Sequence, residues 1–332
     1  MNSRNLQHLL DQKTKPIGSL GHLEELAVRV ATVTGETRPE RLRPSLTIFA
    51  ADHGIAEEGV SAFPQEVTGQ MVSNFLTKGA AANAIAGELG IPVSVVDCGV
   101  KGVLVNEDGL IDMRLGPGTS NSTQGPAMTQ EIAASAISRG RSYGQSLTTN
   151  IACFGEMGIA NTSSATLLAH KLSGILIADL VGRGTGVDDA GLTHKQSVLE
   201  GAAARTGMLE PMDALAEVGG FEIGIMAGAM IGAAASKKVV VVDGFIATAA
   251  SALARAIDPD SEASMVYAHQ SAEHGHTALL EWLEAKPLLD LQMRLGEGTG
   301  ALLVVPIIRA SVSLFGMASF ADAGVSGRSN DT

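Results

Sequence analysis

Apolar residues follow two patterns along this chain, and each pattern predicts one kind of element. Continuous apolar runs, typical of strands buried on both faces of a parallel sheet, predict strands at 45–51, 91–96, 150–154 and 237–242. Helical periodicity and helix-favouring composition predict helices at 6–34 with an interruption at Pro16, at 67–89, 130–147, from 192 onward, and at 219–235, 247–256 and 307–320. The run 173–178 fits either a strand or a helix end.

The alternation of strands and helices predicts an α/β fold, with a Rossmann-like, mainly parallel sheet and helices on both faces. We expect residues 45–306 to form a large α/β catalytic domain, and 1–44 with 307–332 to form a small helical lobe. Polar residues follow the strands, such as Asp52 and His53 after the first. Because open α/β sheets bind ligands at the carboxyl ends of strands, this favours an enzyme. A turn-capping Asp52 and a structural His53 remain the alternatives.

Glycine-rich loops provide the most specific signal. The segment MRLGEGTGA at 293–301 holds one carboxylate, Glu297, between two glycines. Glycine lets a ligand approach the backbone, so Glu297 is placed to take a proton from a ligand docked there. The segment MRLGPGT at 113–119 repeats it with Pro117 in place of Glu297, and GRGTG at 182–186 is a third relative. This suggests one ligand-cradling loop used more than once, with a solvated turn or chance as the alternative.

Composition and charge narrow the class of protein. Lys and Arg number 23 against 35 Asp and Glu, and the formal net charge of −12 argues against general nucleic-acid binding. The two cysteines, Cys98 and Cys153, stand apart in apolar runs, which fits a reducing compartment. No apolar signal region follows Met1, and no charge-free apolar run of about 18 residues indicates a membrane span. We therefore expect a cytoplasmic protein.

Three further segments carry candidate chemistry. Residues 155–163 combine glycines after a strand with polar residues at a helix start, which predicts an anion site or, alternatively, plain helix capping. Lys195 follows the 182–186 loop, although a lysine on a helix is normally solvated. Residues 269–276 hold three histidines and Glu273, the most metal-like cluster, but without the spacing of a zinc protease.

Together these segments resemble the nicotinate-nucleotide–dimethylbenzimidazole phosphoribosyltransferase (CobT) family. The matching stretches follow in order at 15–24, 51–68, 155–162, 182–188, 241–246, 268–273 and 293–300. The resemblance implies transfer of the phosphoribosyl group of nicotinate mononucleotide to 5,6-dimethylbenzimidazole with inversion. The products would be α-ribazole 5′-phosphate and nicotinate, in assembly of the cobalamin lower ligand. It also implies small-molecule substrates, a homodimer, and no cofactor or metal.

The resemblance implies roles for individual residues. Glu297 would be the general base, and Glu156 would lie in the same pocket as a second carboxylate or as an orienting group. The benzimidazole slot would be lined by Ala62, Phe63, Gln70, Met157 and Leu295. The phosphate and ribose would meet Gly158, Asn161, Thr162, Gly184, Thr185, Gly186, Lys195, Asp243 and Ser271. Two rival functions remain: a metal-dependent hydrolase that uses His269, His274 and His276, and a non-catalytic nucleotide sensor, which would have no use for Glu297.

Overall fold

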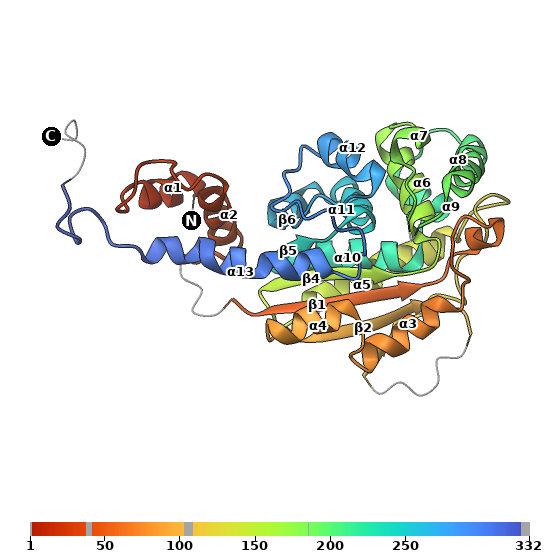
Figure 1. The fold of residues 1–332 in the computed structure, drawn as a ribbon, viewed down its shortest axis with the longest axis horizontal. Helices are drawn as coiled ribbons and strands as arrows, with labels where there is room; N and C mark the ends of the chain where they lie inside the picture. Colours follow the sequence, from red (N-terminus) through yellow and green to blue (C-terminus); the bar gives the residue numbers. More distant parts are fainter. Residues whose placement is uncertain (1, 38–41, 103–108, 185, 327–332) are drawn as a thin grey trace.

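A six-stranded sheet forms the centre of the computed structural model, which describes residues 2–37, 42–102, 109–184 and 186–326 (Figure 1). The strand order is β3-β2-β1-β4-β5-β6, and every neighbouring pair is parallel. The strands are β1 (Pro44–Ala51), β2 (Val93–Gly99), β3 (Leu110–Asp112), β4 (Ile151–Met157), β5 (Val239–Val242) and β6 (Met265–Tyr267). This is the Rossmann order, in which the order of the strands reverses between β1 and β4.

Helices cover both faces of the sheet, which confirms the predicted α/β class. The α-helices of the described residues are α1 (Ser3–Asp11), α2 (His22–Thr34), α3 (Val67–Leu76), α4 (Ala81–Glu88), α5 (Gln130–Ser146), α6 (Asn161–Ser173), α7 (Ile177–Leu180), α8 (Asp189–Ala204), α9 (Pro211–Val218), α10 (Phe221–Ala235), α11 (Phe245–Ile257), α12 (His274–Trp282) and α13 (Thr299–Ser313). Short 3-10 helices are η1 (Gly54–Glu58), η2 (Pro259–Ser264) and η3 (Leu314–Gly316).

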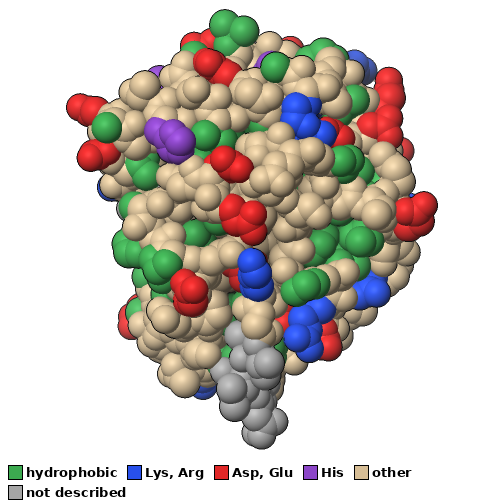
Figure 2. All heavy atoms as spheres, turned by 90° about the vertical axis from the view of Figure 1, so that its right-hand side faces the viewer, with side chains coloured by type: hydrophobic (Ala, Val, Ile, Leu, Met, Phe, Trp, Pro, Cys, Tyr) green, Lys and Arg blue, Asp and Glu red, His purple; other side chains and the backbone are tan. Residues whose placement is uncertain are grey.

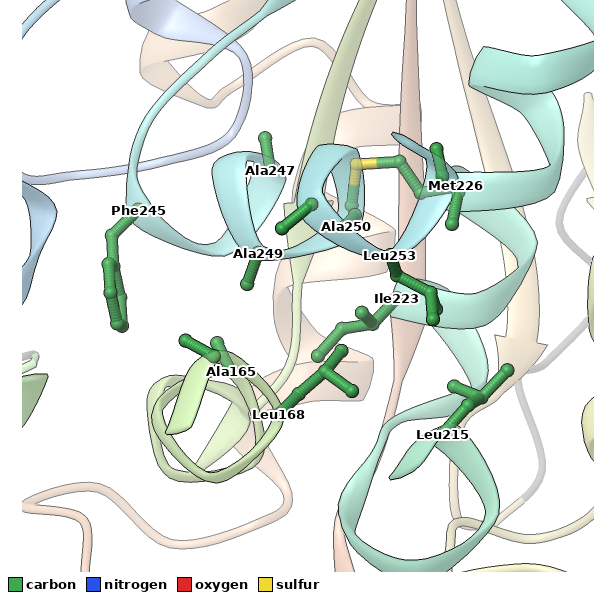
Figure 3. Close-up of a cluster of buried hydrophobic side chains, with 14 of the residues drawn as sticks. Ala165, Leu168, Leu215, Ile223, Met226, Phe245, Ala247, Ala249, Ala250 and Leu253 are labelled. Atoms are coloured by element: carbon green, nitrogen blue, oxygen red, sulfur yellow. The ribbon is translucent and has the colours of Figure 1, made fainter. Parts of the chain in front are cut away.

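Strand residues alternate between two apolar cores, because successive side chains of a strand point to opposite faces. On β4, Ala152 and Phe154 join the core that includes α5, α6, α10 and α11, whereas Ile151 and Cys153 join the core that includes α3, α4 and α13. Figure 3 shows side chains of the first core that meet from α6, α9, α10 and α11: Ala165, Leu168, Leu215, Ile223, Met226 and Leu253.

Glycines allow α5 and α10 to pack backbone against backbone. A Cβ atom added at Gly140 of α5 would lie 2.0 Å from the carbonyl oxygen of Ile225. A Cβ atom at Gly228 of α10 would lie 2.3 Å from the carbonyl oxygen of Ile137. Such distances exclude any side chain at these two positions. The contact fixes α10, whose N-terminus lies beside the carboxyl ends of the strands.

The two ends of the chain share an apolar cluster of their own. Its buried members come from α1, α2 and η3: Leu6, Leu10, Ala27, Ala31, Leu314 and Phe315. Figure 1 shows these helices at its left-hand side, away from the arrowhead of β1. α13 packs on the sheet with its first turns and leads into η3, so it joins this cluster to the sheet core.

Several elements differ from the sequence-based expectation. The expected helix 67–89 is two helices, α3 and α4, because Lys78 has a positive φ of 64° and Gly79 follows it. Residues 173–178 form no strand; α6 ends at Ser173 and α7 begins at Ile177. The strands β3 and β6 are not predicted, since three residues each are too few to show a period.

The expectation that the last helix spans 307–320, after Pro306, is wrong. α13 begins at Thr299, contains Pro306 and ends at Ser313. A proline removes one hydrogen bond from a helix interior, and the burial of Leu302 and Val305 holds these turns in place. The segment 299–316 has the length and composition of a membrane span, but 61% of it is buried inside the protein, as in a core helix.

Candidate active site

The carboxyl ends of β1 and β4 meet at the point where the strand order reverses, which is where open α/β sheets bind ligands. Asp52 and His53 follow β1, and Glu156 and Met157 end β4. Figure 2 shows the molecule from the side to which the β1 arrowhead points. On this face, acidic and basic side chains of the described residues are interspersed. The chemistry therefore depends on individual buried groups near the strand ends.

Glu297 lies on a strained loop that leads into α13. Gly296, Glu297 and Gly298 have consecutive positive φ angles of 84°, 63° and 80°. A glutamate rarely adopts such an angle, and backbone strain of this kind clusters at functional sites. The loop lies directly on β4, since a Cβ atom at Gly155 would be 2.4 Å from the carbonyl carbon of Glu297. Glu297 is 5% exposed as a residue, so its carboxylate is largely shielded from water.

Asp243, which follows β5, holds this loop. Its Oδ2 accepts a hydrogen bond from the Gly298 N–H at 3.1 Å, and its Oδ1 accepts one from the Ala301 N–H at 2.8 Å. Burial raises the pKa of Asp243, while the nearby His269 and the backbone N–H groups oppose that rise. Both carboxylate oxygens are thus engaged by the loop that carries Glu297.

Glu156 is a second carboxyl group beside the same loop. Its Oε2 accepts a hydrogen bond from the side-chain amide of Asn161, and a Cβ atom at Gly296 would lie 2.2 Å from its Oε1. Burial raises the pKa of Glu156 to about 8, with neighbouring carboxylates acting in the same direction and Asn161 opposing them. Burial also raises the pKa of Glu297; the hydrogen bond from the Ala82 N–H opposes this rise, and the charge of Asp243 adds to it. Glu156 therefore holds a proton at neutral pH.

A cationic part of the site lies between the 182–186 loop and the start of α6. The buried Lys195 of α8 donates from Nζ to Oγ1 of Thr162 at 2.9 Å and to the carbonyl oxygen of Gly182 at 3.0 Å. A Cβ atom at Gly184 would be 3.5 Å from the same nitrogen. Burial lowers the pKa of Lys195 to about 8, and the charge of Glu273 partly offsets this effect. Thr162, Gly182 and Gly184 thus surround the ammonium group of Lys195.

The remaining residues expected at the phosphate and ribose are placed as follows. Thr185 lies outside the described residues, and Gly186 has a positive φ of 117°. A Cβ atom at Gly158 would be 2.4 Å from the carbonyl oxygen of Ala51, so this loop packs on the end of β1. Ser271 donates its N–H to Nδ1 of His276 at 2.8 Å, and its hydroxyl accepts from the Glu273 N–H at 3.2 Å.

The residues expected at the benzimidazole come from several elements around the strand ends. Ala62, Phe63, Gln70 and Leu295 are exposed, while Met157 is half-buried. The exposed fractions of Phe63 and Leu295 are 49% and 57%. Apolar side chains this exposed offer surface that a flat apolar ligand could cover.

A buried network below the end of β1 is not predicted from the sequence. The two ring nitrogens of His53 lie 2.8 Å from Oγ of Ser164 and 2.8 Å from Oε1 of Glu222. All three side chains are buried, and Oε2 of Glu222 has no hydrogen-bond partner among the described residues. A signal exists: Glu222 is the one charged residue in the sequence of α10. Because both of its ring nitrogens have buried partners, His53 has a structural role.

The histidines at 269–276 do not converge on one point. His274 is exposed, whereas His269 lies 3.9 Å from Asp243 through its Nε2. His276 accepts from Ser271 at Nδ1 and pairs with Oγ1 of Thr248 at 2.9 Å through Nε2. Burial lowers the pKa of His276 to about 3, so its ring stays neutral. Within the described ranges, no three His, Cys, Asp or Glu side chains group as metal ligands.

The three glycine-rich loops have different surroundings. The 182–186 loop adjoins Lys195, and the 293–301 loop carries Glu297. In the 113–119 copy, the Thr119 N–H donates to the carbonyl oxygen of Asp52 at 3.0 Å, and a Cβ atom at Gly118 would be 3.1 Å from that oxygen. This copy supports the end of β1.

A family model, individual relatives and a solved structure all connect this chain with phosphoribosyltransferases. A family model described as "Phosphoribosyltransferase" matches residues 2–325. Relatives named nicotinate-nucleotide–dimethylbenzimidazole phosphoribosyltransferase include one from Cupriavidus necator, 49% identical over 97% of this chain and 94% of its own length. One from Aromatoleum aromaticum is 47% identical, covering 97% and 95%. The crystal structure of CobT from Thermus thermophilus is similar with a TM-score of 0.94 at 42% identity, covering 98% of this chain and 99% of that one.

Proposed function

Because this chain belongs to the phosphoribosyltransferase family of these relatives, we propose that it transfers the phosphoribosyl group of nicotinate mononucleotide to 5,6-dimethylbenzimidazole. The reaction would give α-ribazole 5′-phosphate and nicotinate, with inversion at the anomeric carbon, for the lower ligand of cobalamin. One observation carries the proposal: Glu297 is a shielded carboxylate with a left-handed backbone conformation, and it lies where the strand order of the sheet reverses.

The chemistry of the two bases explains why one carboxylate suffices. The nicotinate ring nitrogen of the mononucleotide already carries a positive charge and leaves as a neutral pyridine nitrogen, so it needs no general acid. The attacking benzimidazole must lose the proton of its N–H as its other nitrogen bonds to C1′. A carboxylate base beside the incoming ring accepts that proton, which contributes about 10²–10⁴-fold to the rate. Attack opposite the leaving base inverts the sugar.

We assign the base to Glu297 and a supporting role to Glu156. Since the pKa of Glu156 is raised to about 8, this group is protonated at neutral pH and can donate a hydrogen bond to a ligand. We assign proton acceptance to Glu297 because of its position on the strained loop between Gly296 and Gly298. Asp243 orders the loop, through its hydrogen bonds to Gly298 and Ala301.

The two ends of the mononucleotide meet different surroundings in this proposal. Its phosphate and ribose lie against the ammonium of Lys195 and the residues around it: Gly158, Asn161, Thr162, Gly184, Thr185, Gly186 and Ser271. The acceptor base lies against the apolar side chains near Glu297: Ala62, Phe63, Met157 and Leu295, with Gln70 as a polar partner. Positioning of both rings by these contacts supplies much of the remaining rate enhancement.

We further propose that the enzyme is a cytoplasmic homodimer in which residues 1–44 and 307–332 form a small helical lobe. The separate apolar cluster of α1, α2 and η3 supports the lobe. The buried, isolated thiols of Cys98 and Cys153 support a reducing compartment. Sedimentation of the purified protein measures the oligomeric state, and a monomer would contradict the proposed homodimer.

The first experiment incubates the purified protein with nicotinate mononucleotide and dimethylbenzimidazole without added metal. Release of nicotinate is followed, and the second product is identified by mass and by anomeric configuration. Appearance of α-ribazole phosphate is the expected result. Release of nicotinate without this product would mean that water accepts the phosphoribosyl group. Binding of the mononucleotide without turnover would favour a non-catalytic nucleotide sensor.

A further inference from the structure

Arg294 connects the two loops of the proposed active site. It stands three residues before Glu297, and its guanidinium Nη1 donates to the carbonyl oxygen of Gly184 at 3.1 Å, 110 residues away in the chain. Arg294 itself is exposed. Among the described residues, this is the one hydrogen bond that its side chain makes. This bond leaves most of its guanidinium N–H donors without a partner among the described residues.

Among the described residues, no carboxylate pairs with Arg294, whereas two comparable arginines are paired. Arg114 occupies the same position in the 113–119 copy of the motif, and its Nε lies 3.4 Å from carboxylate oxygens of both Asp97 and Asp112. Arg183, in the loop that Arg294 contacts, is paired with Asp189. Within the described part of the chain, no carboxylate oxygen lies within 4.0 Å of an Arg294 nitrogen.

The site near Gly184 needs a second cation if it binds a phosphate dianion. Lys195 supplies one positive charge, with its Nζ 3.5 Å from the Cβ position of Gly184. The carboxylate of Glu273 offsets that charge, since its Oε1 accepts from the Gly184 N–H at 2.9 Å. One lysine beside one carboxylate leaves little net attraction for a ligand with two negative charges. Arg294 lies at the carbonyl side of the same glycine.

We propose that Arg294 binds the 5′-phosphate of the mononucleotide together with Lys195, an inference that rests on the proposed function. Guanidinium groups bind phosphate oxygens through paired, charge-assisted hydrogen bonds, and Arg294 has the free donors for them. Because Arg294 and Glu297 share one loop, the same contact ties the phosphate to the segment that carries the base.

The test compares Arg294→Gln with its matched control, Arg114→Gln. Glutamine removes the positive charge but keeps a polar side chain, and Arg294→Lys keeps the charge on a side chain of similar length. We expect the KM for nicotinate mononucleotide to rise about 10- to 100-fold, as for loss of a hydrogen bond to a charged group. The kcat at saturation and the KM for dimethylbenzimidazole should change little. Arg114→Gln should leave all three values unchanged, and Arg294→Lys should restore part of the affinity.

Ribose 5-phosphate and nicotinate, as competitive inhibitors, separate the two anionic ends of the substrate. Arg294→Gln should weaken inhibition by ribose 5-phosphate and leave inhibition by nicotinate unchanged. Weaker inhibition by nicotinate alone would assign Arg294 to the carboxylate and overturn the proposal. A fall in kcat with unchanged KM would also overturn it, because Arg294 would then only position the loop.

Binding measured by calorimetry keeps this inference separate from the proposed reaction. If the wild-type protein produces no α-ribazole phosphate, the proposed function fails, but binding of ribose 5-phosphate to the wild-type and Arg294→Gln proteins is still measurable. Tighter binding to the wild type supports the phosphate contact. Equal binding refutes it.

Discussion

Asp243→Asn tests whether the anchored loop positions the catalytic base. In the wild type, each oxygen of Asp243 accepts a separate backbone hydrogen bond, from Gly298 at 3.1 Å and from Ala301 at 2.8 Å. Asparagine replaces one oxygen with an NH₂ group, so one buried N–H then faces a donor. An unsatisfied buried donor costs about 1–3 kcal/mol. We expect the free energy of unfolding to fall by about that amount, measured by urea denaturation.

The same substitution should affect turnover more than binding. Movement of the Gly298 end of the loop displaces Glu297, and a misplacement of about 1 Å can reduce a rate about 10²-fold. We therefore expect kcat for nicotinate release to fall about 10- to 100-fold. The KM for the mononucleotide should change little, because Lys195 is held by Thr162 and Gly182. Arg294 lies before the segment that Asp243 anchors and is held by its own hydrogen bond to Gly184.

Asp97→Asn provides a matched control at the end of β2. There a single oxygen, Oδ1, accepts from both Gly99 and Val100 at 2.9 Å, so asparagine can keep both hydrogen bonds. The substitution loses only an ion pair with the half-exposed Arg114, so we expect a smaller loss of stability than in Asp243→Asn. Wild-type kcat in Asp243→Asn, or equal losses in the two variants, would refute the assignment of Asp243 as the anchor.

Three further predictions concern the same site. Glu297→Gln should reduce kcat about 10²–10⁴-fold while both substrates still bind in calorimetry, and near-normal turnover would reject Glu297 as the base. Burial lowers the pKa of Lys195 to about 8, so this lysine loses its charge as the pH rises through that value. The KM for the mononucleotide should therefore rise at alkaline pH in the wild type and stay flat in Lys195→Arg; parallel profiles would exclude Lys195 from phosphate binding. Gly155→Ala should lower both stability, by about 1–3 kcal/mol, and kcat, because its Cβ would lie 2.4 Å from Glu297. Gly201→Ala, where nothing lies within 4 Å, should lower neither, and thermal unfolding with steady-state kinetics would compare the two.

The strands with long apolar runs could be predicted because burial on both faces leaves a continuous signal. β1, for example, is buried along its whole length, and its apolar run predicts a strand at 45–51. The boundary of α13 could not be predicted, because Pro306 is a strong local signal against a helix and is outweighed by tertiary packing. A split between α3 and α4 depends on the backbone angle of Lys78, which no sequence pattern specifies.

The candidate site could be predicted where the chemistry lies in local motifs. Glu297 between glycines and Lys195 after the 182–186 loop are of this kind. The roles of Glu222, Glu273 and Arg294 could not be predicted, because they depend on partners far away in the sequence. Glu222 pairs with His53 across 169 positions, and Glu273 reaches Gly184 across 89.

Because α13 is one continuous helix, insertions and deletions within it should be constrained during evolution. One end of this helix carries the Glu297 loop, and the other leads directly into Leu314 and Phe315 of the terminal cluster. Each residue of an α-helix advances it by about 1.5 Å and turns it by about 100°. A single insertion within α13 would therefore rotate one end out of register with the other, so that either the base or the cluster loses its place. Length changes between residues 299 and 313 should therefore be poorly tolerated.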